Sequence, residues 1–80
     1  MTKSVFTSEY RIFLNILIQT RKKQHMTQSM LAKKLKKPQS YVSKFESGER
    51  RLDVIETREI LLALNTSPVP FWTSMEKELQ

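Results

Sequence analysis

The sequence predicts a compact all-α protein of five helices. Apolar residues recur at helical spacing in separate stretches, and capping or turn residues stand between those stretches. The length of 80 residues is enough for a single domain, which we assign to 1-80 with a frayed N-terminus at 1-6. The chain has no cysteine and one histidine, so we expect neither a disulfide framework nor a zinc cluster, and no cofactor.

The first helix is expected to run from a cap at Thr7 or Ser8 to about Lys23. Side chains at helical spacing form its buried stripe, namely Tyr10, Phe13, Leu14 and Leu17. Arg21 and its two basic neighbours lie in the last turn, where positive charge suits the helix dipole.

The pattern of residues 27–48 predicts two short helices joined by a tight turn. Thr27 can cap the first of them, and the sequence Lys-Lys-Pro breaks it after Leu35. Its inward stripe consists of Leu31, Ala32 and Leu35. The next helix starts near Gln39 and buries Val42 and Phe45, which lie three residues apart and therefore on one face. The side chains left to point outward are Gln39, Ser40, Tyr41, Ser43 and Lys44.

Two more helices complete the domain. Asp53 and Glu56 form a capping-box pattern at the start of the fourth helix, and Asn65 suits the left-handed residue that ends it. Its buried stripe is Ile60, Leu61 and Leu64. A fifth, short helix begins with Pro68 at its first position.

The positive charge of the chain is concentrated in one block. Ten of the 14 Lys and Arg residues lie in 21–51 with only Glu46 and Glu49 against them, which gives this segment +8, while the rest of the chain carries −2. Such asymmetry attracts a polyanion to one face, and double-stranded DNA is the commonest such partner. A basic surface that only keeps the domain soluble is the alternative, and the spacing in 27–48 favours DNA.

The segment 21–72 resembles the lambda-repressor and Cro family of helix-turn-helix regulators, also called the xenobiotic-response-element family. The residues that carry the resemblance are Gln28, Ala32, Ser40, Val42, Ser43, Phe45, Glu46 and Gly48. The resemblance implies a lambda-repressor-like fold whose helix-turn-helix is formed by helices 2 and 3. Three positions depart from the family pattern. His25 and Lys36 replace turn glycines, so both are expected at positive φ, and Met30 replaces a glutamate that would complete a capping box with Thr27.

The resemblance also implies roles for individual residues. The expected base contacts are Gln39, Ser40, Ser43 and Lys44, with Tyr41 against the sugar-phosphate wall or a thymine methyl. The resemblance also implies a phosphate contact at Gln28. The other expected phosphate contacts rest on the residues themselves, which carry ammonium, guanidinium or hydroxyl groups around the two short helices, namely Thr27, Lys36, Lys37, Ser47 and Arg50. Simple solvation or a local capping bond is the alternative for each serine. Arg21 and Glu46 are expected to form a structural ion pair between the first helix and the end of the third.

The segment 66-80 is more apolar than one small domain can easily bury. We interpret it as a dimerisation helix, with an expected interface of Val69, Phe71, Trp72, Met75 and Leu79. The competing interpretation is a tail that folds back on its own domain.

The sequence therefore predicts a regulator that binds double-stranded DNA, as a homodimeric repressor on a palindromic operator. The alternative that the resemblance implies is an antitoxin that binds DNA and contacts a toxin through its apolar tail. An enzyme is disfavoured because His25 is the only imidazole and no glycine-rich loop is present. No stretch is apolar for long enough to span a membrane and no signal segment is present, so we expect a cytoplasmic, nucleoid-associated protein.

Overall fold

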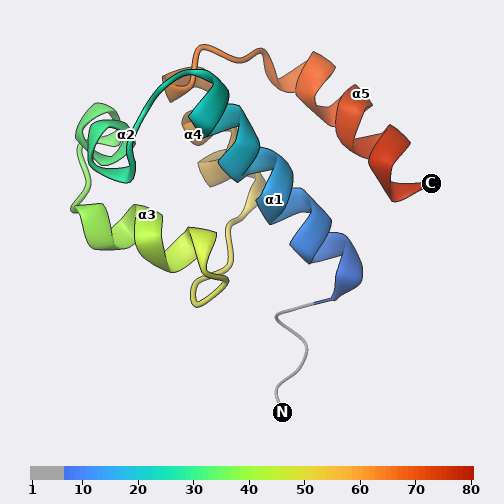
Figure 1. The fold of residues 1–80 in the computed structure, drawn as a ribbon, viewed down its shortest axis with the longest axis horizontal. Coiled ribbons are helices and arrows are strands. Elements are labelled where there is room, and N and C mark those ends of the chain that lie inside the picture. Colours follow the sequence, from blue (N-terminus) through green and yellow to red (C-terminus); the bar gives the residue numbers. More distant parts are fainter. Residues whose placement is uncertain (1–6) are drawn as a thin grey trace.

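Five α-helices and no strand make up residues 7–80, the part of the chain that the computed structural model describes. The helices are α1 Ser8–Lys23, α2 Gln28–Leu35, α3 Gln39–Glu46, α4 Val54–Ala63 and α5 Pro68–Leu79. Figure 1 shows α1 crossing the middle of the molecule, with α5 along one side of it and α3 on the other. The all-α, five-helix prediction is confirmed. The fraying predicted for residues 1-6 concerns a segment outside the described residues.

Helices α1 and α4 begin after the polar capping residues that the sequence indicates. The hydroxyl of Thr7 accepts a hydrogen bond from the backbone N–H of Tyr10 at 3.0 Å. Asp53 and Glu56 form the reciprocal capping box of α4, with distances of 2.7 and 3.0 Å. These caps satisfy backbone donors that have no partner inside the helix.

The expectation that α2 lacks a capping box is wrong. Thr27 accepts from the backbone N–H of Met30, and the sulfur of Met30 lies 3.5 Å from the backbone nitrogen of Thr27. Thioether sulfur is a weak acceptor, so it occupies the place of the glutamate oxygen with a weaker bond.

Three non-glycine residues adopt left-handed backbone conformations where helices end. His25 has φ 58°, Lys36 has φ 59° and Asn65 has φ 56°, as predicted for all three. Such a conformation costs an ordinary L-residue roughly 1–2 kcal/mol, and asparagine less. The chain therefore keeps sharp turns after α1, α2 and α4 at some cost in stability.

All five helices contribute to one core. Its buried side chains are Leu17, Leu31, Ala32, Val42, Phe45, Ile60, Leu61, Leu64, Phe71 and Met75. Tyr10 adds a polar link, because its hydroxyl accepts a hydrogen bond from the backbone N–H of Leu52 at 3.1 Å. This bond ties the start of α1 to the segment between α3 and α4.

Candidate nucleic-acid interface

A left-handed turn joins α2 to α3 and fixes their relative orientation. Lys36 has φ 59° and ψ 43°, and the backbone N–H of Lys37 donates back to the carbonyl of Ala32 at 3.0 Å. Val42 and Phe45 are then buried to 0 % and 1 % exposure, so one face of α3 is fixed in the core. The opposite face is held at the surface of the molecule.

The predicted base contacts mostly lie on this outer face. Gln39, Ser40 and Lys44 are exposed, and Ser43 is half-buried. They carry amide, hydroxyl and ammonium groups, which are the groups that hydrogen-bond to base edges in the major groove.

Tyr41 differs from this expectation, because its side chain does not simply point outward. The ring is half-buried, packs against the core and meets the ring of Phe45 edge-on, with 5.6 Å between centroids. The Lys37 ammonium lies 5.3 Å from the Tyr41 ring centroid and the Arg50 guanidinium 4.9 Å from it. Burial raises the pKa of the Tyr41 hydroxyl above 10.0, so the ring stays neutral and serves as a support for two cations.

The predicted phosphate contacts surround α3. Thr27, Lys36, Lys37, Ser47 and Arg50 are exposed, and Gln28 is half-buried. A hollow of about 330 Å³ between α2 and α3 brings Lys33 and Lys37 together with Gln39. Lys33 was not among the predicted phosphate contacts. Its helical spacing from the buried residues of α2, which places it on the outer face, could have indicated it.

Arg21 and Glu46 form the predicted ion pair between α1 and α3. Arg21 Nε lies 2.7 Å from Glu46 Oε2, and Arg21 Nη2 lies 3.0 Å from Glu46 Oε1. Their side chains are 10 % and 6 % exposed, so the two-point contact is largely removed from solvent. Arg21 Nη1 also donates to the carbonyl of Met26 at 2.8 Å, which fixes the guanidinium plane.

Gln28 extends this pair toward the reading face, a connection that the sequence did not reveal. Its Nε2 donates to Glu46 Oε1 at 2.9 Å, and its Oε1 accepts from Gln39 Nε2 at 3.2 Å. One chain of hydrogen bonds therefore runs from Arg21 to Gln39, through residues of three helices.

Ser47 and Arg50 both have partners within the protein. The Ser47 hydroxyl donates to the carbonyl of Lys44 and accepts from the backbone N–H of Glu49. Arg50 Nη2 donates to Glu56 Oε2 at 2.7 Å, and its Nη1 donates to the carbonyl of Arg51. These bonds leave other N–H groups of the guanidinium available to a phosphate, since arginine has five.

The contact between Arg50 and Glu56 predicts a pH dependence of stability. The hydrogen bond from Arg50 lowers the pKa of Glu56 below 4.5, assisted by the backbone N–H of Asp53. A carboxyl whose folded pKa is depressed stabilises the protein above its unfolded pKa, and that contribution is lost as pH falls. We expect Glu56→Gln to lower the urea midpoint at about pH 7, and we expect this difference from the original protein to shrink as pH falls below the ordinary glutamate pKa. A difference that stays constant as pH falls would contradict this assignment.

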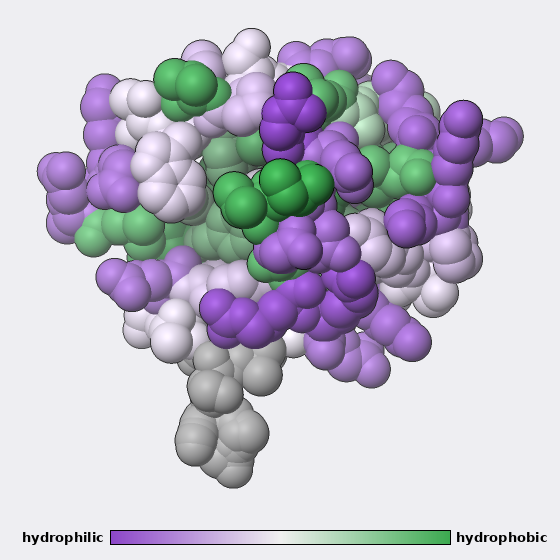
Figure 2. Space-filling model, turned by 180° about the vertical axis from the view of Figure 1, so that it is seen from behind, coloured by the Kyte–Doolittle hydropathy of each residue, from purple (hydrophilic) through white to green (hydrophobic). Residues whose placement is uncertain are grey.

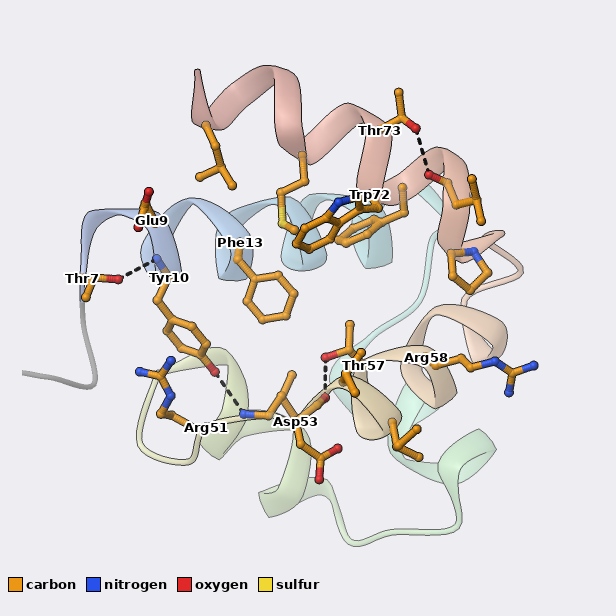
Figure 3. Close-up of a pocket in the computed structure, with 18 residues that line it drawn as sticks. Thr7, Glu9, Tyr10, Phe13, Arg51, Asp53, Thr57, Arg58, Trp72 and Thr73 are labelled. Atoms are coloured by element: carbon orange, nitrogen blue, oxygen red, sulfur yellow. Dashed lines mark hydrogen bonds between the residues drawn. The ribbon is translucent and has the colours of Figure 1, made fainter.

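An apolar groove of about 770 Å³ lies between the start of α1, the start of α4 and α5. Seen from behind, the molecule carries hydrophobic side chains near the middle of its surface, with hydrophilic ones around them (Figure 2). Figure 3 shows Tyr10, Phe13 and Trp72 facing this groove, with Arg51 and Arg58 at its rim. The exposed hydrophobic residues that line it are Val54, Ile55, Val69 and Trp72.

The expected dimer interface divides into two groups in the structure. Phe71 and Met75 are 6 % and 3 % exposed and belong to the core, so they line the groove from inside and offer little surface of their own. Leu79 is partly buried against the same core. Val69 and Trp72 are 76 % and 54 % exposed, because helical spacing places them on the outer side of α5.

Two negative findings concern residues 7–80. No helix in this range is both long and apolar enough to cross a membrane. The same range contains no group of three or more His, Asp or Glu side chains placed to hold a metal ion.

Comparisons with known proteins agree with this geometry. A family model described as helix-turn-helix matches residues 17–71. The structure is similar to that of an XRE-family like protein from Pseudomonas syringae pv. tomato str. DC3000, with 37 % sequence identity and a TM-score of 0.88. The match covers 99 % of this chain and 96 % of that one. Among curated proteins no significant match is found. The chain belongs to the XRE family of helix-turn-helix DNA-binding regulators.

Proposed function

We propose that this regulator is a homodimeric repressor that binds a palindromic operator through the major groove. The observation that carries the proposal is the exposed polar face of α3, presented on a buried scaffold beside the basic block 21–51. An α-helix of this kind fits the major groove, and the basic block supplies attraction to the phosphates. Selection from a randomised duplex library, followed by binding at several salt concentrations, tests the proposal. Equal weak affinity for every sequence would contradict it.

Two groups of residues have separate roles in this proposal. Gln39, Ser40, Ser43 and Lys44 read base edges, because they lie on the outer face of α3. Thr27, Gln28, Lys36, Lys37, Ser47 and Arg50 contact phosphates, because they lie around α3 rather than on that face. Phosphate contacts position a protein on DNA, whereas base contacts choose the sequence.

A pair of alanine variants distinguishes the two roles. We expect Gln39→Ala to cost ~1–3 kcal/mol on the selected site and to relax the preference at one base pair. Lys37→Ala should weaken binding to all sequences alike and reduce the slope of affinity against salt by about one unit. Titration of both variants with selected and random duplexes provides the measurement. Identical behaviour of the two variants on both kinds of DNA would contradict the division of roles.

The homodimer is assigned to the apolar groove. Among residues 7–80, six large hydrophobic residues are exposed, and four of them line this groove. Scattered exposed hydrophobic residues are normal, but a contiguous group indicates an interaction surface. In Figure 1, α5 and α3 lie on opposite sides of α1, so a contact through α5 leaves α3 available to DNA. A dimer with recognition helices ~34 Å apart would read two half-sites one helical turn apart.

Sedimentation of the DNA-free protein tests the dimer. We expect a dimer at micromolar concentration, and we expect Val69→Asp to shift it to monomer, because an unpaired charge in an apolar interface is costly. Leu62→Asp is the matched control, since Leu62 is also exposed, at 48 %, but does not line the groove. A monomer in the original protein, or equal dissociation in both variants, would contradict this interface.

The dimer would repress by occupying promoter DNA and excluding polymerase. The antitoxin alternative uses the same groove for a toxin, and a monomer that binds the product of an adjacent small gene would support that alternative.

A further inference from the structure

Arg50 is held in place by α4, a helix that contributes none of the proposed DNA contacts. We propose that Glu56 is a positioning residue for DNA binding, because it fixes the Arg50 guanidinium against the Tyr41 ring before a phosphate arrives. This inference rests on the proposed phosphate contact of Arg50. It adds the start of α4 to the parts of the molecule that determine affinity for DNA.

The Glu56 carboxylate is fixed at both of its oxygens. Its Oε1 accepts from the backbone N–H of Asp53 at 3.0 Å, as part of the capping box that begins α4. Its Oε2 accepts from Arg50 Nη2 at 2.7 Å. The Glu56 backbone N–H donates in turn to the Asp53 carboxylate, so the side chain that holds Arg50 is tied to a helix end. Arg50 is therefore anchored to the start of α4.

Two further contacts restrict the guanidinium. Arg50 Nη1 donates to the carbonyl of Arg51 at 3.3 Å, and the Arg50 guanidinium carbon lies 4.9 Å from the centroid of the Tyr41 ring. That ring is itself fixed, because it packs against the core and meets the Phe45 ring edge-on. Hydrogen bonds on both terminal nitrogens, together with an aromatic face, leave the guanidinium few alternative orientations.

Arg50 can still bind a phosphate in this arrangement. Arginine has five N–H donors, and the two bonds use one donor on each terminal nitrogen. The Arg50 side chain is 42 % exposed, so part of it is open to solvent. Lys37 lies close by, with its ammonium 5.3 Å from the same Tyr41 ring centroid. The Tyr41 ring therefore contacts two cations that are both proposed to meet the DNA backbone.

The expected effect of Glu56 on affinity has the opposite sign to the effect of its charge. A glutamate near DNA repels phosphates, so removal of its charge would by itself strengthen binding. An arginine already held in place avoids the entropy cost of immobilisation on binding, which corresponds to about 2–10-fold in affinity. Salt screens the repulsion at this partly exposed site but leaves the entropy cost unchanged. Loss of Glu56 should therefore weaken DNA binding.

Glu56→Gln removes the contact with Arg50 and little else. Glutamine at this position also forms a capping box, so the start of α4 is retained. An amide has a single oxygen, which remains on the backbone N–H of Asp53. The NH₂ group then faces Arg50 and cannot accept its hydrogen bond.

The test measures the affinity of the intact chain for a selected and a random duplex at several salt concentrations. Circular dichroism first establishes that each variant is folded in the binding buffer. Glu56→Gln should weaken binding to both duplexes by about 2–10-fold with an unchanged salt slope, because Arg50 keeps its charge. Arg50→Ala should weaken both and reduce the slope by about one unit. In the Arg50→Ala background, Glu56→Gln should cause no further loss.

Glu59→Gln is the matched control. Glu59 is an exposed glutamate one turn further along α4, and the bonds of Arg50 described above go to Glu56 and to the Arg51 carbonyl. The same change of charge at Glu59 should not lower affinity.

Three results would overturn the inference. They are an affinity of Glu56→Gln equal to or above that of the original protein, an equal loss in Glu59→Gln, and a loss from Glu56→Gln that persists in the Arg50→Ala background. Unchanged affinity and salt slope in Arg50→Ala is a distinct result, because it overturns the proposed phosphate contact of Arg50 together with the inference.

A measurement without DNA tests the positioning itself, and it remains decisive if Glu56→Gln folds poorly. In NMR spectra of the original protein, the ring current of Tyr41 should shift side-chain protons of Arg50 upfield. In Glu56→Gln these protons should move toward the shifts of arginine in an unfolded peptide, whereas Glu59→Gln should leave them in place. Unfolded-peptide shifts for Arg50 in the original protein would overturn the inference independently of any binding result.

Discussion

Replacing Glu46 with alanine is expected to destabilise the protein by about 3–5 kcal/mol. The Arg21 side chain is only 10 % exposed in the original protein, and the substitution removes its counter-ion while the carbonyl of Met26 remains as an acceptor. A buried charge without its counter-ion is costly because water no longer solvates it. The free energy of unfolding in urea, followed by circular dichroism, measures the effect.

Two further variants show whether the loss comes from the broken pair. Glu49→Ala is the matched control, because Glu49 is an exposed glutamate three residues away and its removal should change stability by less than about 0.5 kcal/mol. The double variant Arg21→Met with Glu46→Leu should recover most of the loss, since neither charge remains. The prediction is wrong if Glu46→Ala is as stable as Glu49→Ala.

Replacing Phe45 with alanine is expected to cost about 3–5 kcal/mol as well. Its ring is 1 % exposed, and its removal leaves a cavity between the helices that the fixed backbone cannot fill. Val42 and Phe45 are the only buried residues of α3, and a helix of eight residues is not stable by itself. We therefore expect loss of DNA binding together with loss of stability, measured by urea unfolding and by titration with duplex DNA.

A more conservative substitution at position 45 tests whether the loss comes from the missing apolar volume. Phe45→Leu retains most of the apolar volume and should cost clearly less than Phe45→Ala. If Phe45→Ala costs below about 1 kcal/mol, Phe45 is not what holds α3 to the core.

Features that depend on neighbours in sequence were predictable. The caps Thr7 and Asp53 gave the starts of α1 and α4, and Asn65 gave the left-handed end of α4. The positive φ of Lys36 was expected from the resemblance, because the family commonly has glycine at that position. Such signals are local, because a cap bonds to backbone groups two or three residues away. Helix existence and helix ends therefore agreed with the sequence.

Features that depend on contacts between helices were harder to predict from the sequence. The bond between Gln28 and Glu46 joins residues 18 positions apart, and no pattern in the sequence indicates that distance. Tyr41 was expected outward because Val42 and Phe45 define the inward face, but the Phe45 ring and two cations contact the Tyr41 ring. On α5, helical spacing could have separated Phe71 from Trp72, since adjacent residues on a helix point about 100° apart.

The left-handed conformation of His25 has a consequence for engineering. Glycine adopts positive φ without the clash that a side chain brings. Replacing His25 with glycine should therefore raise the free energy of unfolding by roughly 1 kcal/mol. His25 lies outside the residues assigned to DNA, so a stabilising substitution there can offset destabilising substitutions made elsewhere. A scaffold reinforced there would tolerate more extensive redesign of its operator preference.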